Sequence, residues 1–269
     1  MWIILLIALP LLLNAAVTGL VAWGRTVPES AAQIEQAFAQ TIANYSTDME
    51  RAYRVYASGS FAEITAQRGR DYMSIGFEAY FIISFQVMAM FLLGVYFGKQ
   101  GIFRNLEAHR GLFRRLFVWG RMLGLGGNFL YATLILSTPR MVPTGPLLLA
   151  TAGQFIGAPL LMLAYVSAFC LLMLAPGWGE RLSVLAPVGQ MALTNDLTQS
   201  VVCTTIFYSY GLGLFGQMSV AAGVGLTLLI YGLQIVLSHW WMKRFRYGPA
   251  EWLWRSLTYG KFMPMKRSD

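Results

Sequence analysis

The chain has 269 residues, of which 57% are hydrophobic and only 12% are charged. An ordinary soluble domain carries about a quarter charged residues, and the mean hydropathy of this chain is +0.55. A soluble fold is therefore excluded. Long apolar runs of this kind form membrane-spanning helices, so we expect an all-α, polytopic helical bundle in a membrane.

Six apolar runs have a length of about 20 residues or more. They cover residues 2–23, 75–97, 117–137, 146–174, 187–208 and 219–241. At a rise of about 1.5 Å per residue, each run can cross the ~30 Å hydrocarbon core, which predicts about six transmembrane helices. The first run could be a secretory signal, but it is long for one and no basic segment precedes it, so we interpret it as a retained helix.

The runs divide the chain into four regions. These are a first transmembrane helix (1–23), an extracytoplasmic helical loop (24–74), a five-helix transmembrane region (75–241) and a basic tail (242–269). Most Lys and Arg residues follow the second, fourth or sixth run, whereas the loop has more acidic than basic residues. Because cytoplasmic loops accumulate Lys and Arg, alternation across six spans places both termini in the cytoplasm. The net charge of +8 is then a topology signal, and we expect the lipid bilayer, not nucleic acid, as the partner.

The loop predicts two helices. A capping box at Thr26 and Glu29 opens a helix that should end near Gly59. A second capping box, Ser60 with Glu63, opens a shorter helix.

The tail predicts one further helix, which begins at Pro249. Glu251 and Arg255 are four residues apart and can pair on its surface. Trp252 and Trp254 favour a helix that lies along the cytoplasmic membrane surface. The alternative is that Glu251 and Arg255 fold back and close a pocket.

The fifth run holds most of the polar residues found within the predicted spans. Its polar side chains, predicted to share one side of a helix, are Asn195, Asp196, Gln199, Ser200 and Cys203. Asp196 would lie about 13 Å into the bilayer, and an ionisable group at that depth is a candidate functional site.

Other spans offer partners for this polar face. Asn128 and Gln234 lie well inside the third and sixth runs, as does Gln154 in the fourth. Arg121 lies about 6 Å into the third run and could pair with Asp196. Alternatively, Asp196 stays protonated and bonds to an amide. The neutral amides could also serve only as interhelical contacts.

The reactive residue types give no support for catalysis. Cys170 and Cys203 lie inside predicted spans and are interpreted as packed apolar side chains. His109 and His239 have no Ser, Cys or carboxylate at a diagnostic spacing. The sequence therefore leaves any catalytic residue unidentified and predicts no metal site and no cofactor. Gly-xxx-Gly spacings in the third and fourth runs predict close helix packing.

Three stretches resemble the YeiB-like family of bacterial inner-membrane proteins of unknown function. They are residues 56–63, 189–200 and 245–259, and the similarity extends roughly from 50 to 262. This sequence departs from the family pattern at Gln190 and Asp196, where family members usually have Arg and Tyr, respectively. The positions that carry over are Asn195, Gln199, Ser200, Gly248, Pro249, Glu251, Trp252 and Arg255.

The resemblance implies a bacterial inner-membrane protein, distantly similar to acyltransferases that pass an acyl group across the bilayer, with transport as another suggested role. The leading hypothesis is a protein that handles a small solute or lipid-linked group in a polar intramembrane pocket. Transmembrane acyl transfer is the enzyme alternative. A third is a non-catalytic partner of a further membrane subunit or of additional N-terminal helices, since family members generally begin with further helices.

Overall fold

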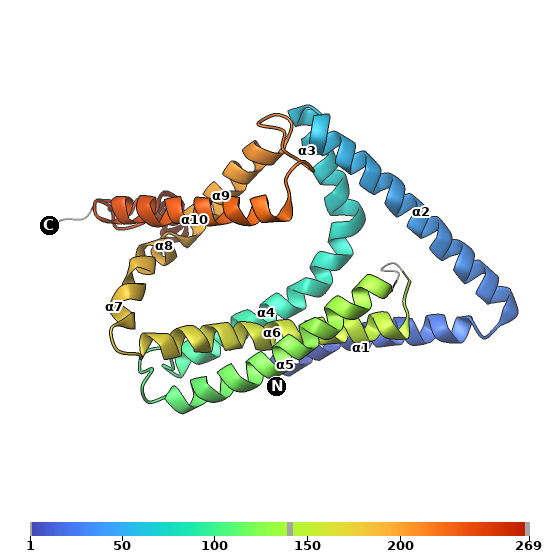
Figure 1. Cartoon of the computed structure of the whole chain (residues 1–269), viewed down its shortest axis with the longest axis horizontal. Coiled ribbons are helices and arrows are strands. Elements are labelled where there is room, and N and C mark those ends of the chain that lie inside the picture. Colours follow the sequence, from blue (N-terminus) through green and yellow to red (C-terminus); the bar gives the residue numbers. More distant parts are fainter. Residues whose placement is uncertain (1, 139–141, 267–269) are drawn as a thin grey trace. The chain divides into compact units, whose positions relative to one another are not determined.

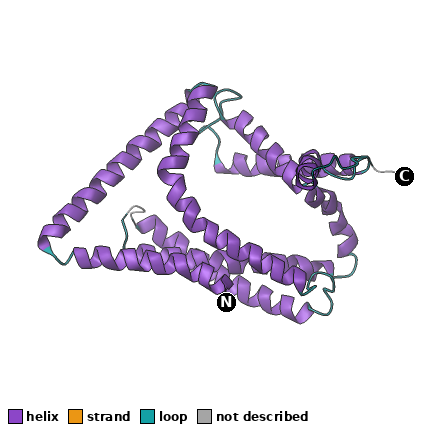
Figure 2. Cartoon of the chain, turned by 180° about the vertical axis from the view of Figure 1, so that it is seen from behind, coloured by secondary structure: helices purple, strands orange, loops and turns teal. Residues whose placement is uncertain are grey.

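The computed structural model describes residues 2–138 and 142–266, so the last three residues of the predicted tail lie outside the described residues. Every secondary-structure element in these ranges is a helix (Figure 2). The expectation of an all-helical fold is confirmed. The chain divides into two compact units, Met1–Met49 with Arg70–Pro176 and Glu50–Gly69 with Gly177–Asp269, which are described separately below.

The first unit contains four long helices and the beginning of a fifth (Figure 1). The four are α1 (Trp2–Gly24), α4 (Phe77–Lys99), α5 (Arg110–Ser137) and α6 (Gly145–Met173), and α2 (Pro28–Ser58) begins in this unit. A π-helical turn, Tyr72–Gly76, leads into α4. The side chain of Thr144 caps α6 by accepting a hydrogen bond from Leu147 N at 3.3 Å.

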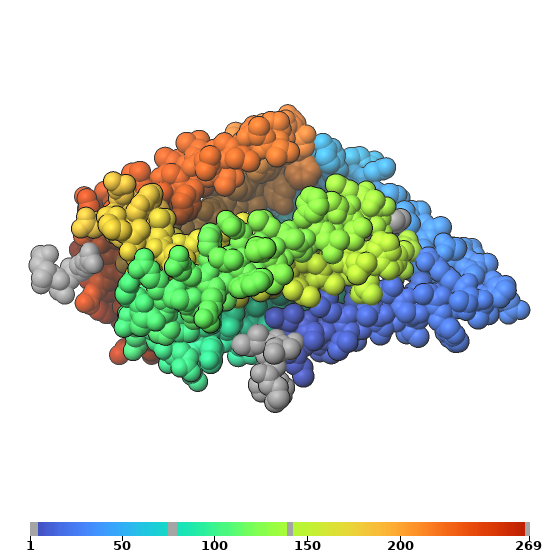
Figure 3. Space-filling view, turned by 60° about the horizontal axis from the view of Figure 1, so that its bottom comes forward, coloured from blue at the N-terminus to red at the C-terminus, as the bar shows by residue number. Residues whose placement is uncertain are grey.

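Glycines bring α5 and α6 together along their length. In the space-filling view, α5 in green lies directly against α6 in yellow-green (Figure 3). A Cβ atom on Gly120 would lie 2.6 Å from the carbonyl oxygen of Leu160, and one on Gly127 would lie 2.5 Å from that of Gly153. Because only glycine permits so close an approach, the predicted packing at the Gly-xxx-Gly spacings is confirmed.

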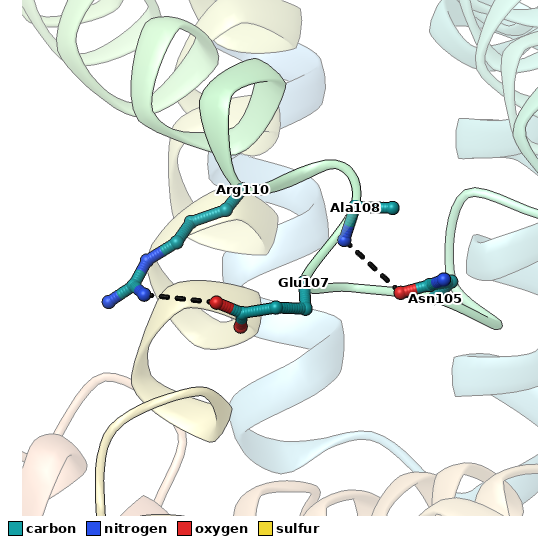
Figure 4. Close-up of polar contacts among 4 residues, drawn as sticks. All are labelled: Asn105, Glu107, Ala108 and Arg110. Carbon is teal, nitrogen blue, oxygen red and sulfur yellow. Dashed lines mark hydrogen bonds and ion pairs between the residues drawn. The ribbon is translucent and has the colours of Figure 1, made fainter.

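The turn between α4 and α5 covers a small apolar cluster. Its buried members are Phe97, Ile102, Phe113 and Cys170, so the interpretation of Cys170 as a packed apolar side chain is confirmed. Figure 4 shows the polar contacts that hold the turn: Ala108 N donates to Asn105 Oδ1 at 3.1 Å, and the Arg110 guanidinium pairs with Glu107 at 3.1 Å.

The end of α2 lies in the second unit, and the other helices begin there. They are α3 (Phe61–Asp71, which begins here), α7 (Trp178–Leu182), α8 (Ala186–Gln190), α9 (Ala192–Phe207), α10 (Val220–Met242) and α11 (Pro249–Tyr259), with a 3₁₀ turn at Ser183–Leu185. The side chain of Ser219 caps α10 by accepting from Ala222 N at 3.3 Å. Helix α11 ends at Gly260, whose φ of 63° is a left-handed conformation that glycine adopts without strain.

The fifth apolar run is not the single helix that the sequence predicts. It breaks at Met191, whose φ and ψ are −111° and 29°, into α8 and α9. The Met191 amide still bonds back to Pro187 O at 3.1 Å, and its carbonyl accepts from Asn195 N at 2.8 Å. The break therefore changes the direction of the chain with little loss of backbone hydrogen bonds.

One of the two predicted capping boxes forms. Glu63 Oε2 accepts from Ser60 N at 2.7 Å, and Glu63 N donates to Ser60 Oγ at 3.3 Å. The bond from Ser60 N and a second one from Ser60 Oγ to Glu63 Oε2, at 2.8 Å, lower the pKa of the Glu63 carboxyl. The predicted capping box at Thr26 does not form. The Thr26 hydroxyl donates to the Trp23 carbonyl at 2.6 Å, and α2 begins only at Pro28.

Four of the described helices are long and apolar enough to cross a membrane: α1, α4, α6 and α10. The other two predicted spans stay predictions. The third, 117–137, lies in α5 and contains Arg121 and Asn128, and the fifth is divided at Met191, which leaves 16 residues in α9.

Candidate functional site

A network of polar side chains joins α9 to α8 and α10. Asn195 Nδ2 donates to Ser238 Oγ at 3.1 Å and to Val188 O at 3.2 Å. Gln234 Nε2 donates to Asn195 O at 2.8 Å, and Gln234 Oε1 accepts from Gln199 Nε2 at 2.6 Å. Asn195, Gln234 and Ser238 are 9%, 4% and 0% exposed. The amides of the network bond to one another, as the interpretation of interhelical contacts expects.

The five polar residues predicted to share one side of a helix all lie in α9, but only Asn195 and Gln199 bond to α10. Asp196 and Ser200 are exposed and Cys203 is half-buried. Each residue turns the helix by about 100°. Asn195 and Gln199 therefore face α10 together, and Asp196 and Ser200 lie a quarter turn away. Their role as binding residues stays a prediction.

Arg121 and Asn128 belong to the first unit. The Arg121 guanidinium lies 5.2 Å from the centre of the Phe117 ring, and Asn128 Nδ2 donates to Gly124 O of its own helix at 2.7 Å. A pair between Arg121 and Asp196, which lies in the second unit, stays a prediction. Gln154, the third amide considered, is exposed on α6.

The start of α11 is fastened to the start of α9 by reciprocal caps. Glu251 accepts hydrogen bonds from Thr194 N at 3.1 Å and from Thr194 Oγ1 at 2.5 Å, and Thr194 Oγ1 accepts from Ala250 N at 3.0 Å. A Cβ atom on Gly248 would collide with both Glu251 and Thr194. The Glu251 carboxylate is thus turned towards α9, and the placement of α11 along the membrane surface stays a prediction.

A pocket of about 560 Å³ lies beside this junction. Its lining residues, from the α8–α9 break and from the tail, are Gly189, Gln190, Ala192, Leu193, Arg246, Tyr247, Glu251, Trp254 and Arg255. The Arg255 guanidinium lies 4.8 Å from the centre of the Tyr247 ring. Two arginines and one carboxylate thus meet an apolar wall, an arrangement suited to a ligand with a polar and an apolar part.

Residues 261–266 fold back along α11. Arg246 N donates to Met265 O at 2.9 Å, Trp252 Nε1 donates to Met263 O at 2.7 Å, and Met263 N donates to Ser256 Oγ at 3.3 Å. These bonds hold the backbone of the pocket wall at Arg246. Trp252 is half-buried by them, whereas Trp254 is exposed.

Aromatic side chains join the end of α2 to the loop after α9. The rings of Tyr56 and Tyr208 stack at 5.1 Å, and Tyr53 meets Phe215 edge to face at 5.5 Å. Ser209 N also donates to Tyr56 O at 3.3 Å. These aromatic residues pack residues 53–61 against residues 208–215 within the second unit.

Sequence reasoning missed Thr194, Ser238 and these tyrosines. A signal existed for two of them. Thr194 lies inside the 189–200 stretch that carries the family resemblance, and Ser238 follows Gln234 by one helical turn. No sequence spacing pointed to the contact between Tyr56 and Tyr208, which are far apart in the chain.

The apolar helices indicate a membrane protein, and comparison with known sequences gives its family. Residues 97–261 match the family described as protein of unknown function (DUF418), and the chain belongs to this family. The resemblance to YeiB-like proteins is confirmed. The polar network and the residues lining the pocket all lie inside the matched region.

Three curated relatives are uncharacterised proteins. YxaH of Bacillus subtilis is 38% identical over 227 residues, which is 81% of this chain and 53% of YxaH. YeiB of Escherichia coli is 38% identical over 38% of this chain and 26% of its own length. A 39.9 kDa protein encoded in the amylase 3′ region of Bacillus acidopullulyticus is 34% identical over 40% of this chain and 30% of its own length. The chain thus spans about half of YxaH and less of the others. No solved structure matches.

Proposed function

We propose that the protein binds a small solute, or the polar end of a lipid-linked group, in the pocket between α8, α9 and α11, and handles or moves it at the membrane. The observation that carries this proposal is the pocket itself. It has about 560 Å³ and a lining that combines Arg246 and Arg255 with the Trp254 ring. Pockets of about 300 to 1,000 Å³ accommodate small-molecule ligands.

The polar network has a supporting role in this proposal. Its amides bond to each other, so they have little capacity left for a ligand. They hold α8 and α9 against α10, and so fix one wall of the pocket. This differs from a ligand site at Asn195 and Gln199 themselves, which the sequence suggested.

Transmembrane acyl transfer is supported less well. The reaction needs a nucleophile or general base at the substrate. Among the described residues that line the pocket there is no Ser, Cys or His, and both oxygens of Glu251 accept hydrogen bonds from Thr194. The pocket therefore favours binding. A further membrane subunit or additional helices as partners remain compatible with it.

We also propose the six-span arrangement, with both termini in the cytoplasm of a bacterium. Alternation across six spans puts residues 53–61 and 208–215 on the outer face, and the second unit brings these two segments together. It also puts the beginning of the fifth span, which includes residues 189–194, at the inner side together with residues 246–255, and these too are in contact. Both contacts join segments that the proposed topology places on the same side.

The pocket is tested by filling it. Gly189 lines the pocket, and a Cβ atom there meets nothing within 4 Å, so Gly189→Trp can project into it without moving the backbone. The full chain is purified in mild detergent, and bound solutes and lipids are identified by native mass spectrometry. We expect a bound mass in the wild type that Gly189→Trp loses.

Gly223→Trp is the matched control. Gly223 is equally open but lies on α10, outside the pocket. We expect this variant to keep the bound mass. A wild type with no bound mass, or equal retention by Gly189→Trp and Gly223→Trp, would overturn the proposal.

A further inference from the structure

We infer that the ligand of this pocket carries a phosphate group and that Arg246 and Arg255 bind it. The inference rests on the proposed function, because it names the chemistry of the ligand in the same pocket. It starts from the charge of the lining, which has two guanidinium groups and a single carboxylate.

The carboxylate does not neutralise the arginines. Both oxygens of Glu251 accept hydrogen bonds from Thr194, at 3.1 Å and 2.5 Å, so its charge is directed at the first turn of α9. In the part of the chain that the structure describes, no ion pair joins an acidic side chain to Arg246 or Arg255. The pocket therefore has an excess of positive charge.

Both arginines are exposed at the pocket; a ring contact positions the side chain of Arg255, and a hydrogen bond positions the backbone of Arg246. The Arg255 guanidinium lies 4.8 Å from the Tyr247 ring centre, and a stacked guanidinium keeps its N–H groups free at the edge. The backbone of Arg246 is fixed by its hydrogen bond to Met265 O at 2.9 Å. Guanidinium groups bind phosphate oxygens through paired N–H donors, which gives both affinity and orientation.

The size and the apolar wall indicate that the phosphate is part of a larger molecule. About 560 Å³ is far more than an inorganic phosphate fills. Leu193 and Trp254 add apolar surface to the lining, which suits a carbon skeleton. A soluble phosphate ester and a phospholipid headgroup share this chemistry, and the experiment must separate them.

The soluble source is tested with sn-glycerol 3-phosphate. The full chain in phosphatidylcholine nanodiscs is titrated with this ester by calorimetry, beside glycerol, which lacks the phosphate, and glycerate, which has a carboxylate instead. The lipid source is tested in nanodiscs containing phosphatidylglycerol, and the lipid retained by the protein is measured by native mass spectrometry. Binding in either arm supports the inference and names the source.

The arginines are tested by Arg246→Gln and Arg255→Gln. Each removes a charge-assisted hydrogen-bond donor, and we expect binding to weaken about tenfold to a hundredfold. Arg255→Lys keeps the positive charge but lacks the paired N–H donors of a guanidinium, and it should weaken binding less than Arg255→Gln does. Arg244→Gln is the control, since Arg244 lies 4.8 Å from the Trp240 ring in the same segment but does not line the pocket.

Several outcomes would overturn the inference. They are an absence of phosphate binding in both arms, equal binding of glycerol or glycerate, and equal loss of binding in Arg244→Gln, which would indicate only general surface charge. If Gly189→Trp removes a bound mass that the two arginine variants keep, the pocket is a site but not an anion site. If Gly189→Trp changes nothing, the proposed function fails as well.

Discussion

The Glu251 carboxylate accepts two hydrogen bonds from Thr194, 57 residues earlier in the chain. Glu251 lies in the first turn of α11, and Thr194 lies in the first turn of α9. Each residue satisfies backbone N–H groups that the other helix leaves without an intrahelical partner. Two helix ends are therefore capped by one tertiary contact, which also closes one side of the pocket.

Loss of the Thr194 side chain should release α11. Thr194→Val leaves the Glu251 carboxylate with one donor fewer and Ala250 N without its cap, which costs about 1 to 3 kcal/mol. We expect trypsin to cut the tail near Lys261 roughly ten times faster or more. In the control Thr198→Val, the lost hydroxyl bonds only within α9, to Thr194 O, and the cleavage rate should not change. Equal rates for the two variants would contradict the reciprocal cap.

Gly248 should tolerate no side chain. In Gly248→Ala the new methyl group meets Glu251 and Thr194, and such overpacking costs about 1 to 3 kcal/mol. The same trypsin assay should show faster release of the tail. Gly223→Ala adds a methyl group in open space on α10 and should behave as the wild type. An unchanged Gly248→Ala would show that α11 is attached in another way.

The amides of α9 and α10 should contribute to stability as a pair. Gln199→Leu and Gln234→Leu each break the 2.6 Å bond between them. A double-mutant cycle in mixed detergent micelles should give a coupling free energy of about 0.6 to 1.7 kcal/mol. Gln154→Leu, at an exposed position on α6, should leave the free energy of unfolding unchanged. A coupling of zero would reject the structural role of the pair.

Acid should loosen the first turn of α3. The pKa of Glu63 is lowered by its bonds to Ser60, so the carboxylate stabilises the helix start above its unfolded pKa of about 4.3. That stability is lost as the pH falls from there through the lower folded pKa. Hydrogen exchange of residues 61–71 should rise, relative to intrinsic rates, over this range. In Glu63→Gln exchange should already be raised at neutral pH and should change little with acid, and identical pH profiles would contradict this.

Labelling of single cysteines tests the topology. With Cys170→Ala and Cys203→Ala as background, Ser46→Cys on the exposed surface of α2 should react with an impermeant maleimide on intact spheroplasts. Thr258→Cys in the exposed part of α11 should react only after permeabilisation. The reverse pattern, or labelling of both positions from outside, would reject six spans with cytoplasmic termini.

Some features could be predicted because their cause is local in the chain. The capping box of Ser60 and Glu63 needs only residues three apart, and it forms. Helix α10 begins after Ser219, as the apolar run predicts, because the serine caps it. The Thr26 box failed although its spacing is the same, because α2 begins at Pro28 and its first intrahelical bond, from Ala31 N, goes to Val27 O, so Thr26 lies one residue too early to cap it.

The sequence by itself determined the class of protein and the list of polar residues. Low charge and long apolar runs predict helices, since the backbone must satisfy its own hydrogen bonds in lipid. The order of the residues also placed Asn195, Gln199 and Gln234 in their helices. These are properties of composition and helical period, which need no tertiary structure.

Only the tertiary structure decided which of these polar groups bond to each other. The break at Met191 turns Thr194 towards α11, so that Glu251 bonds to it and Arg255 lies over Tyr247 at the pocket. It also leaves Asp196 exposed, while Asn195 on the same helix is buried. Hydrogen bonds between residues 57 apart depend on the direction of two helix axes. That direction follows from the packing of whole helices, and no local spacing in the sequence contains it.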